Sequence, residues 1–250
     1  MSVTADLHIH SALSPCGSLD MSPAAIVARA RKLGLDMIAV TDHNTMANVA
    51  ATFEAGRRAG VEVIPGMEAQ TLEGVHVLCY FPDCDVAAEC YREIYPRLPD
   101  MPNNVDYFGD QVVVDADDNV IGFEPRVLLN SLELSIDELV ALVRGFGGET
   151  VPAHVESSGF GLLPHLGMVP PHLDLDILEI AWPHTRDQVL REHPDLEPFA
   201  LISNSDAHYL RDIGRAFSRI PGEEKGFSAL FAAYREGRGE IVHPEAATHD

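Results

Sequence analysis

Two histidines lie close together near the start of the sequence, in the apolar segment ADLHIH. His8 and His10 are two residues apart, so on an extended strand their imidazoles project from the same face. Imidazole is a common metal ligand, and a pair on one face could hold an ion. An isolated H-x-H pattern is weak evidence, because a lone histidine in an apolar strand is most often a buried core residue. Its meaning depends on the rest of the sequence.

Residues of the same kind recur at the ends of other apolar, strand-like segments. They are Asp42 and His43 in AVTDH, Glu68 in PGME, His76 in GVHVL, His154 in ETVPAH, and Asp206 and His208 in SNSDAH. Burying so many imidazoles and carboxylates in one place is costly unless they share cations. Nitrogen and oxygen ligands without paired thiolates suit zinc, manganese or iron. The pattern therefore predicts a site for more than one metal ion.

Short apolar runs alternate with segments of helical spacing along the chain. A helix is expected from Ser22-Pro23 to Gly34, because proline is favoured in a first turn and glycine ends a helix. Ser135 and Glu138 form a capping box before another helix. The strands are apolar throughout, which is typical of a parallel sheet covered by helices. The carboxyl ends of such strands meet at one rim, where α/β barrels carry their active sites.

One segment, at about 95–130, interrupts this alternation. Its first part is rich in proline (YPRLPDMPNN), and its second part, DQVVVDADDNVIGFE, predicts a β-hairpin that turns at residues 117–119. We interpret the segment as an insertion in a single domain that spans residues 1–250. It could be a lid that sets specificity or an ornament at the edge of the fold. The C-terminal residues 243–250 are expected to fray.

Composition restricts the classes of partner. The 250 residues carry 39 acidic and 17 basic side chains, a formal net charge of −22, which argues against binding a long nucleic acid. A small phosphorylated substrate is compatible with this charge if metal ions make the site locally positive. The sequence has no apolar run long enough for a membrane span and no signal-peptide pattern. The four cysteines form no CxxC pair, so we expect reduced thiols in a cytoplasmic protein.

In their order and spacing, the segments DLHIH, TDH, GME with GVHVL, PAH and SNSDAH resemble the successive motifs of the PHP (polymerase and histidinol phosphatase) metallophosphoesterases. The resemblance is strongest to the small, stand-alone TrpH-like members, and it runs from about Ala5 to Arg215. Each motif alone is short, and their joint order carries the signal. The resemblance implies an α/β fold, a distorted (β/α)7 TIM-like barrel that holds two or three divalent ions.

The resemblance also implies a set of ligands. A first ion would be held by His8, His10, Glu68 and Asp206, a second by Glu68, His76 and His154, and a third by His43, His208 and a residue of the loop after the first strand. That loop residue is usually His or Asp in the family, whereas this loop reads SALSPCG. Cys16 could supply a thiolate there, or the third position could be weak or empty. Asp42 could orient His43, or it could cap the following helix.

The implied reaction is hydrolysis of a phosphomonoester or phosphodiester, in which two cations share a hydroxide and direct it at phosphorus. The candidate catalytic residues are Glu68 as the bridging carboxylate, His208, and Asp206, which could orient the attacking water or accept its proton. Arg215 could bind a substrate phosphate or could form a surface ion pair. His184 is a rim residue that could contact the substrate.

Two other functions compete with this interpretation. An amidohydrolase also begins with H-x-H, but its usual binuclear form needs a lysine at the end of a middle strand, and the only lysines, Lys32 and Lys225, fall in or near helices. A non-catalytic metal-binding module is the second alternative, although such modules typically lose ligands and here His, Asp or Glu fills eight of the nine expected positions. The sequence leaves open the phosphoester, the metal (manganese, iron or zinc) and the oligomeric state.

Overall fold

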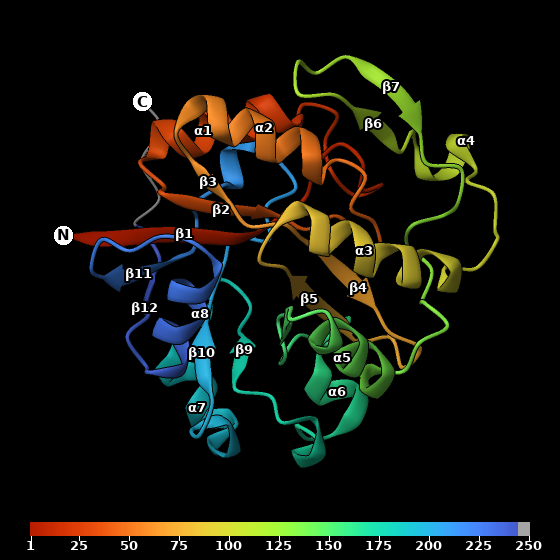
Figure 1. Cartoon of the computed structure of the whole chain (residues 1–250). Coiled ribbons are helices and arrows are strands. Elements are labelled where there is room, and N and C mark those ends of the chain that lie inside the picture. The colour runs from red at the N-terminus through yellow and green to blue at the C-terminus, as the bar shows by residue number, and fades with distance from the viewer. Residues whose placement is uncertain (245–250) are drawn as a thin grey trace.

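A central group of strands carries helices on its outer side in the computed structural model of the protein, which describes residues 1–244 (Figure 1). The strands are β1 (Ser2–Ile9), β2 (Met37–Val40), β3 (Glu62–Val63), β4 (Gly66–Gln70), β5 (His76–Tyr80), β6 (Val112–Val114), β7 (Val120–Phe123), β8 (Glu149–Pro152), β9 (Ile177–Glu179), β10 (Ala200–Ile202), β11 (Phe217–Pro221) and β12 (Glu240–Val242). The helices are α1 (Pro23–Leu33), α2 (Val49–Ala59), α3 (Cys84–Ile94), α4 (Val105–Phe108), α5 (Ile136–Gly145), α6 (Leu162–Leu166), α7 (Arg186–Glu192) and α8 (Phe227–Arg235). Most of the tail that we expected to fray lies outside the described residues.

The strands form a mixed α/β fold with small sheets, none of which closes into a barrel within residues 1–244. The largest sheet has the order β12-β11-β1-β2-β3, and the others are β4-β5-β8, β10-β9 and β6-β7. Isolated bridges link neighbouring sheets, because Ile9 pairs with Ala207 and His43 pairs with Glu68. The carboxyl ends of β1, β2, β4 and β10 therefore lie close to one another.

The expectation of a parallel sheet is wrong for part of this structure. β1, β2 and β3 are parallel, as are β9 and β10, but β4 pairs with β5 and β5 pairs with β8 in antiparallel register. Residues 71–75, which join β4 to β5, are too few for the crossover that parallel strands need. Gln70 consequently lies opposite His76, and the amino end of β5 meets the carboxyl end of β4.

β1 is held by β2 on one edge and by segments from the C-terminal half of the sequence on the other. β11 pairs with it in antiparallel register, a strand that the sequence analysis did not foresee. The buried carboxylate of Asp6 accepts hydrogen bonds from the backbone N–H groups of Ser205 (3.0 Å) and Gly214 (2.9 Å). The backbone N–H of Leu7 donates to the side chain of Asn204 at 2.9 Å. These bonds fix the end of β1 against the segment that follows β10.

The helix ends follow the predicted capping residues. The Ser22 side chain accepts a hydrogen bond from the N–H of Ala25, and Gly34 ends α1 in the left-handed conformation at φ 75°. Ser135 and Glu138 form the predicted capping box at the start of α5. None of the helices within residues 1–244 has the length and hydrophobicity needed to cross a membrane.

The predicted hairpin consists of β6 and β7 and lies beside α2 and α3 (Figure 1). Its turn is fastened to the first two helices, because Arg58 pairs with Asp117 at 2.6 Å and the Ser22 hydroxyl donates to Asp118 at 2.7 Å. The Asn48 side chain bonds the backbone of β6 on both sides, donating to the carbonyl of Val112 and accepting from the N–H of Val114. The segment is thus an attached edge of the described fold.

The close packing of α2 on β3 leads to a stability prediction. A Cβ atom at Gly56 would lie 2.7 Å from the carbonyl oxygen of Val61 and would clash with the side chain of Val63. Alanine usually stabilises a helix relative to glycine, but we expect Gly56→Ala to lower the free energy of unfolding by about 1–3 kcal/mol because the helix must move off the strand. The matched control is Gly145→Ala at the exposed end of α5, where a Cβ has no neighbour within 4 Å and should leave stability unchanged or raised. Urea titration followed by circular dichroism compares the two, and equal effects would contradict the packing argument.

Candidate metal centre

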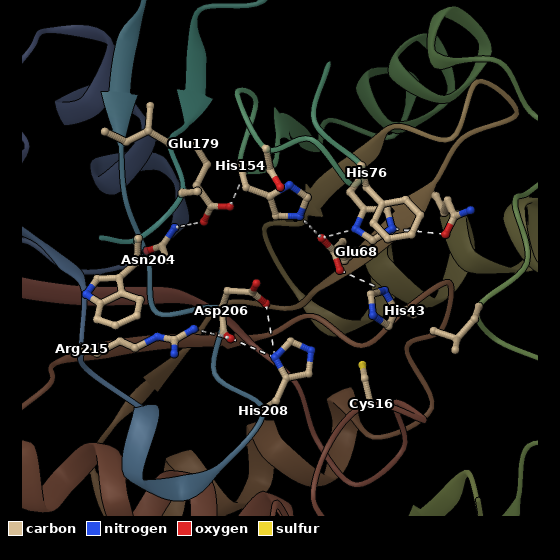
Figure 2. Close-up of a pocket in the computed structure, with 17 residues that line it drawn as sticks. Cys16, His43, Glu68, His76, His154, Glu179, Asn204, Asp206, His208 and Arg215 are labelled. Atoms are coloured by element: carbon tan, nitrogen blue, oxygen red, sulfur yellow. Dashed lines mark hydrogen bonds and ion pairs between the residues drawn. The ribbon is translucent and has the colours of Figure 1, made fainter. Parts of the chain in front are cut away.

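A cavity of about 530 Å³ opens where the strand ends meet (Figure 2). Its lining contains seven of the nine predicted ligands: Cys16, His43, Glu68, His76, His154, Asp206 and His208. The other two, His8 on β1 and His10 directly after it, are fully buried and contact Glu68 and Asp206. The structure therefore brings all nine side chains together, although they come from six separate segments of the sequence.

The carboxylate of Glu68 occupies the centre of this group. Glu68 lies on β4 and is 1% exposed. Nitrogen atoms of five histidines surround its two oxygens, at 3.4 Å for His8 Nε2, 3.4 Å for His10 Nε2, 2.9 Å for His43 Nδ1, 2.8 Å for His76 Nδ1 and 3.3 Å for His154 Nε2. One carboxylate thus has the position of a bridge between several imidazoles, as expected for a group shared by two ions.

Asp206 forms a second carboxylate position on the cavity wall. Its Oδ1 lies 3.4 Å from His8 Nε2, 3.2 Å from His10 Nε2 and 3.6 Å from His208 Nδ1. The side chain is 38% exposed, so unlike Glu68 it can meet solvent or substrate. Burial raises the pKa of this carboxyl, but the neighbouring His8 and His10 outweigh burial and hold it well below its usual range.

Cys16 lies at the exposed mouth of the cavity, with its sulfur directed toward His43 (Figure 2). Potential ligand atoms of Cys16, His10, His43 and His208 all lie within 4.8 Å of one another. Burial raises the pKa of the Cys16 thiol, but hydrogen bonds with His208 and His43 lower it to about 7. A thiolate is therefore well populated at neutral pH, and the thiolate is the form that binds metals.

The charges of the buried groups are balanced within the cluster. Burial raises the pKa of Glu68, but the surrounding histidines, His76 first, hold it well below its usual range. Burial lowers the pKa of His43, yet Glu68 and Cys16 raise it to about 10. Burial and the charge of His43 lower the pKa of His10 to about 3, so His10 is neutral with a free lone pair. Protons on imidazoles thus offset the buried carboxylates, and metal ions can take the place of such protons.

The nitrogen and oxygen atoms of this cluster are arranged as ligands of divalent ions would be, and several of them cannot form hydrogen bonds with one another. His76 Nδ1 lies 2.8 Å from Glu68 Oε1 but is not aligned with it, so this buried nitrogen has no hydrogen-bond partner within residues 1–244. His8 Nε2 and His10 Nε2 approach to 3.2 Å. Close nitrogen pairs and a misaligned nitrogen–oxygen contact are expected where several ligands converge on shared cations.

The backbone at two of these residues is held in an uncommon conformation. His154 (φ 32°) and Asp206 (φ 45°) both have positive φ, a conformation that is uncommon for residues other than glycine. Arg215 supports the second of them, because its guanidinium donates to the carbonyl oxygens of Ser205 (2.7 Å) and Asp206 (3.2 Å). The N–H of His154 is held by the carboxylate of Glu179 at 3.2 Å.

Glu179 is a site residue that the sequence analysis missed. It is buried at the end of β9, where it accepts hydrogen bonds from His8 Nδ1 (2.9 Å) and from the side chain of Asn204 (2.8 Å). The bond to Nδ1 orients His8 so that Nε2 faces Glu68, as a partner of a ligating histidine does. Its signal was in the sequence, because a glutamate in the apolar strand ILEI follows the same rule as the other strand-end residues.

Both interpretations of Asp42 are wrong. Its hydrogen bonds within the described chain come from Ser11, through the backbone N–H (2.7 Å) and the hydroxyl (2.6 Å), and from the hydroxyl of Ser14 (2.7 Å). It neither bonds the His43 ring nor caps α2. Ser14 in turn contacts His10 Nδ1 at 3.1 Å. The carboxylate of Asp42 therefore fixes the loop after β1. Ser11 and Ser14 are close together in this loop, so both can donate hydrogen bonds to the same carboxylate.

The two candidate substrate-binding residues have different positions. Arg215 lines the cavity, stacked at 4.4 Å over the ring of Trp182, but two of its nitrogens are already bonded to backbone carbonyls. His184 does not line the cavity, because its Nδ1 bonds Glu156 at 2.9 Å and the side chain is 51% exposed. Arg215 is thus near the candidate site as a support of the backbone, and His184 is outside it.

Comparison with known families gives a match to the PHP domain over residues 6–150 and to the PHP-associated region over residues 198–238. The first match alone covers more than half of the chain. The protein belongs to the PHP family. His154 and Glu179 lie between the two matched ranges, so their position in the centre is known only from their contacts in the structure.

Individual relatives match only part of this PHP domain. A 5'-3' exoribonuclease of Haemophilus influenzae is 37% identical over 76 residues, 29% of this chain and 27% of the relative. A phosphoribosyl 1,2-cyclic phosphate 1,2-diphosphodiesterase of Eggerthella lenta is 35% identical over 78 residues, 29% of each. The matched part of the chain thus spans less than a third of the length of either relative.

The fold is similar to that of a lesion-specific endonuclease from Pyrococcus furiosus. The TM-score is 0.72 at 20% identity, and the superposition covers 96% of this chain and 58% of that chain. A structure of endonuclease Q with a 27-mer duplex substrate, which has an abasic lesion at the active site, gives a TM-score of 0.70 at 21% identity, over 97% and 58% of the two chains. At this level of identity the likeness concerns the fold.

The position of Glu179 leads to a prediction about metal affinity. In Glu179→Gln one carboxylate oxygen becomes an NH2 group, which cannot accept from His8 or from the backbone N–H of His154. We expect the affinity for zinc or manganese to fall by about 10- to 100-fold, the usual cost of losing such a partner. Competition with a fluorescent chelator measures the affinity. Glu156→Gln is the matched control, because Glu156 bonds Ala181 and His184 outside the cluster; an equal loss in both variants would contradict a specific role of Glu179.

Proposed function

We propose that this PHP domain hydrolyses a small phosphate ester, a phosphomonoester or a phosphodiester such as a nucleotide, with the help of bound divalent ions. The observation that carries the proposal is the convergence of imidazole, carboxylate and thiol groups on one carboxylate at the base of an open cavity. Two of the relatives, an exoribonuclease and a cyclic phosphate diesterase, are named for activities on phosphoester bonds.

The ligands divide into three groups, of which the first two share Glu68. We assign His8, His10, Glu68 and Asp206 to one ion, Glu68, His76 and His154 to a second, and Cys16, His43 and His208 to a third. Manganese, iron or zinc suits such mixed imidazole and carboxylate groups. When bound, ions of this kind supply a hydroxide at neutral pH and neutralise charge on phosphoryl oxygens.

Asp206, Glu68 and His208 have different roles in the proposed reaction, which follow from their exposure and contacts. Asp206 is ionised and partly exposed, so its carboxylate can accept a hydrogen bond from a water molecule in the cavity and orient that water. Its lowered pKa makes it a weak proton acceptor, which favours the orienting role. Glu68 is ionised but sealed from solvent, which suits a ligand and excludes it from proton exchange. His208 Nδ1 is held by the carbonyl oxygen of Asp206 at 2.9 Å, so its other nitrogen faces Cys16 and the cavity.

The size and charge of the cavity favour a small substrate. A volume of about 530 Å³ is in the range of small-molecule sites. Arg215 is the one lysine or arginine among its lining residues, and the net charge of the chain is −22. A long nucleic acid would need a basic path beyond the cavity to neutralise its phosphates. The neighbour that acts on a duplex is a longer chain than this one.

Two exposed aromatic side chains in the lining suit a nucleobase. Trp182 is 42% exposed with Arg215 on one face, and Phe160 is 45% exposed and stacks on His76 with a centroid distance of 4.2 Å and an angle of 3°. Flat aromatic surfaces beside a phosphate site can stack a base. We therefore place nucleotides first among the candidate substrates, ahead of sugar phosphates.

The competing functions fit the site less well. Lys32 and Lys225, the two lysines of the chain, do not line the cavity, and so the usual binuclear amidohydrolase centre cannot form. A non-catalytic metal-binding module needs no accessible cavity above its ions, whereas Asp206 faces such a cavity here. We favour the hydrolase for these two reasons.

We further propose that residues 1–250 act as one domain with a distorted barrel of seven strands, β1, β2, β4, β5, β8, β9 and β10. Backbone bonds between the sheets support this order. They join Asn44 to Glu68 at 2.8 Å, Val155 to Glu179 at 2.9 Å and His10 to Ala207 at 2.9 Å. The rim of this barrel would then be the metal centre.

The proposed reaction predicts turnover of phosphoesters that depends on His154. The metal-loaded chain should hydrolyse p-nitrophenyl phosphate, its bis ester or a mononucleotide. His154→Ala should reduce kcat/KM by about a thousandfold, since metal ions supply several kcal/mol in such reactions. The control is His172→Ala, which removes an exposed histidine paired with Asp137 on the surface.

The outcome separates the three functions. Hydrolysis of amides without hydrolysis of phosphoesters would support an amidohydrolase. No turnover of either class, with the metal content confirmed by mass spectrometry, would support a binding module.

The aromatic wall predicts a difference between substrates. Trp182→Ala should raise KM for a nucleoside monophosphate by about 5- to 150-fold, because stacking of a base on an aromatic ring is worth about 1–3 kcal/mol. KM for glycerol phosphate, which has no ring, should change little. Phe123→Ala, an exposed aromatic on β7 outside the cavity, is the matched control. An equal change for both substrates would refute the stacking role of Trp182.

A further inference from the structure

The three ligand groups of the centre differ in one chemical respect. The groups around His8, His10 and Glu68 and around His43, Glu68 and His76 offer only nitrogen and oxygen. The group of His10, Cys16, His43 and His208 includes a sulfur atom. Sulfur is a soft ligand that favours zinc and other soft or borderline ions, whereas manganese prefers oxygen.

The loop that carries Cys16 is fixed at several points. Its backbone bonds join Ser14 to Ser11 at 3.1 Å, Gly17 to Ser14 at 2.8 Å and Ser18 to His208 at 2.9 Å. The last of these ties the loop directly to a residue of the same ligand group. A Cβ atom at Gly17 would clash with the carbonyl oxygen of Ser11, so the turn needs a glycine. The sulfur is thus positioned before any ligand arrives.

The two histidines beside Cys16 are also oriented by partners outside the group. His208 Nδ1 bonds the carbonyl oxygen of Asp206 at 2.9 Å, and His43 Nδ1 contacts Glu68 at 2.9 Å. Their Nε2 atoms are the ones left to face the sulfur. Since His10 is assigned to the first ion, three ligands remain in this group, Cys16, His43 and His208. Three protein ligands with the cavity on the remaining side form the pattern of an open zinc position.

We propose that Cys16, His43 and His208 form a zinc-selective position that rejects manganese, while the nitrogen and oxygen ligands around Glu68 accept either metal. The chain would accordingly hold two kinds of ion in one centre. This inference rests on the metal centre of the proposed function, and it is independent of the reaction that the centre catalyses.

The test uses the full chain stripped of metal by a chelator and titrated with Co²⁺, which reports a bound thiolate by a charge-transfer band in the near ultraviolet. We expect this band in the unaltered protein and in the control Cys84→Ser, since Cys84 lies at the start of α3 outside the cavity. Cys16→Asp should still bind Co²⁺ but should lack the band. A band that persists in Cys16→Asp, or that is missing from the unaltered protein, would overturn the proposal.

Metal competition tests the selectivity itself. Equimolar Zn²⁺ should remove the Co²⁺ band, and a large excess of Mn²⁺ should leave it. In Cys16→Asp the affinity of this position for Zn²⁺ should fall by at least about tenfold, because even the loss of a residue that only orients a ligand reduces metal affinity by that factor. The preference of this position for Zn²⁺ over Mn²⁺ should decrease as well. Removal of the band by Mn²⁺ as readily as by Zn²⁺ would refute a selective site.

A second measurement needs no variant. Zn²⁺ should slow the alkylation of Cys16 by iodoacetamide, followed by peptide mass spectrometry, whereas Mn²⁺ should not, and alkylation of Cys84 should be unaffected by either ion. Equal rates at Cys16 with and without Zn²⁺ would refute the proposal even if Cys16→Asp failed to fold. A positive result without any phosphoester turnover would leave this inference standing and remove only the proposed reaction.

Discussion

The buried negative charge of Glu68 is the constraint on which the rest of the structure depends. Moving a carboxylate out of water costs several kcal/mol unless partners compensate it. Five histidines from four segments supply that compensation, which requires these segments to meet at the same rim. The order of strands around the centre is therefore determined by the need to compensate the charge of Glu68 as well as by packing. The antiparallel turn of β5 belongs to this solution, because it delivers His76 from the amino end of a strand.

A second layer of polar groups makes the first one rigid. Glu179 orients His8 and holds the backbone of His154, and Asp42 fixes the loop that carries Cys16. Each of these carboxylates is buried with several hydrogen-bond donors, which is the condition under which buried charge specifies a single arrangement. The ligands can thus lie close together before any cation is present. The loss of conformational entropy that this order requires occurs when the chain folds and not when it binds metal.

Residue type and position at strand ends were sufficient to find eight of the nine side chains of the centre, because neighbouring strand ends converge whatever the detailed geometry. Cys16 lies in a loop and was predicted only from the resemblance to the PHP family. The same reasoning failed where local contacts decide. His184 turns to Glu156 instead of the cavity. Arg215 does line the cavity, with two of its nitrogens bonded to backbone carbonyls, and its contact with a substrate stays a prediction. The direction of β5 and β8 and the pairing of β11 were not predictable from apolar runs, which look alike in parallel and antiparallel strands. Glu179 was predictable from its place in β9 and was overlooked.

The bonds of Asp6 have a consequence for how the protein is made. Its two backbone donors, Ser205 and Gly214, follow it by about 200 residues, at separations of 199 and 208. β1 is synthesised long before these partners. Until the residues of β11 have followed it, one of its edges has no partner and His8 and His10 have no Asp206. Contacts of such long range form slowly and leave an apolar strand open to aggregation in the meantime. For the same reason, the carboxylate of Asp206 joins His8 and His10 only after most of the described residues have been synthesised.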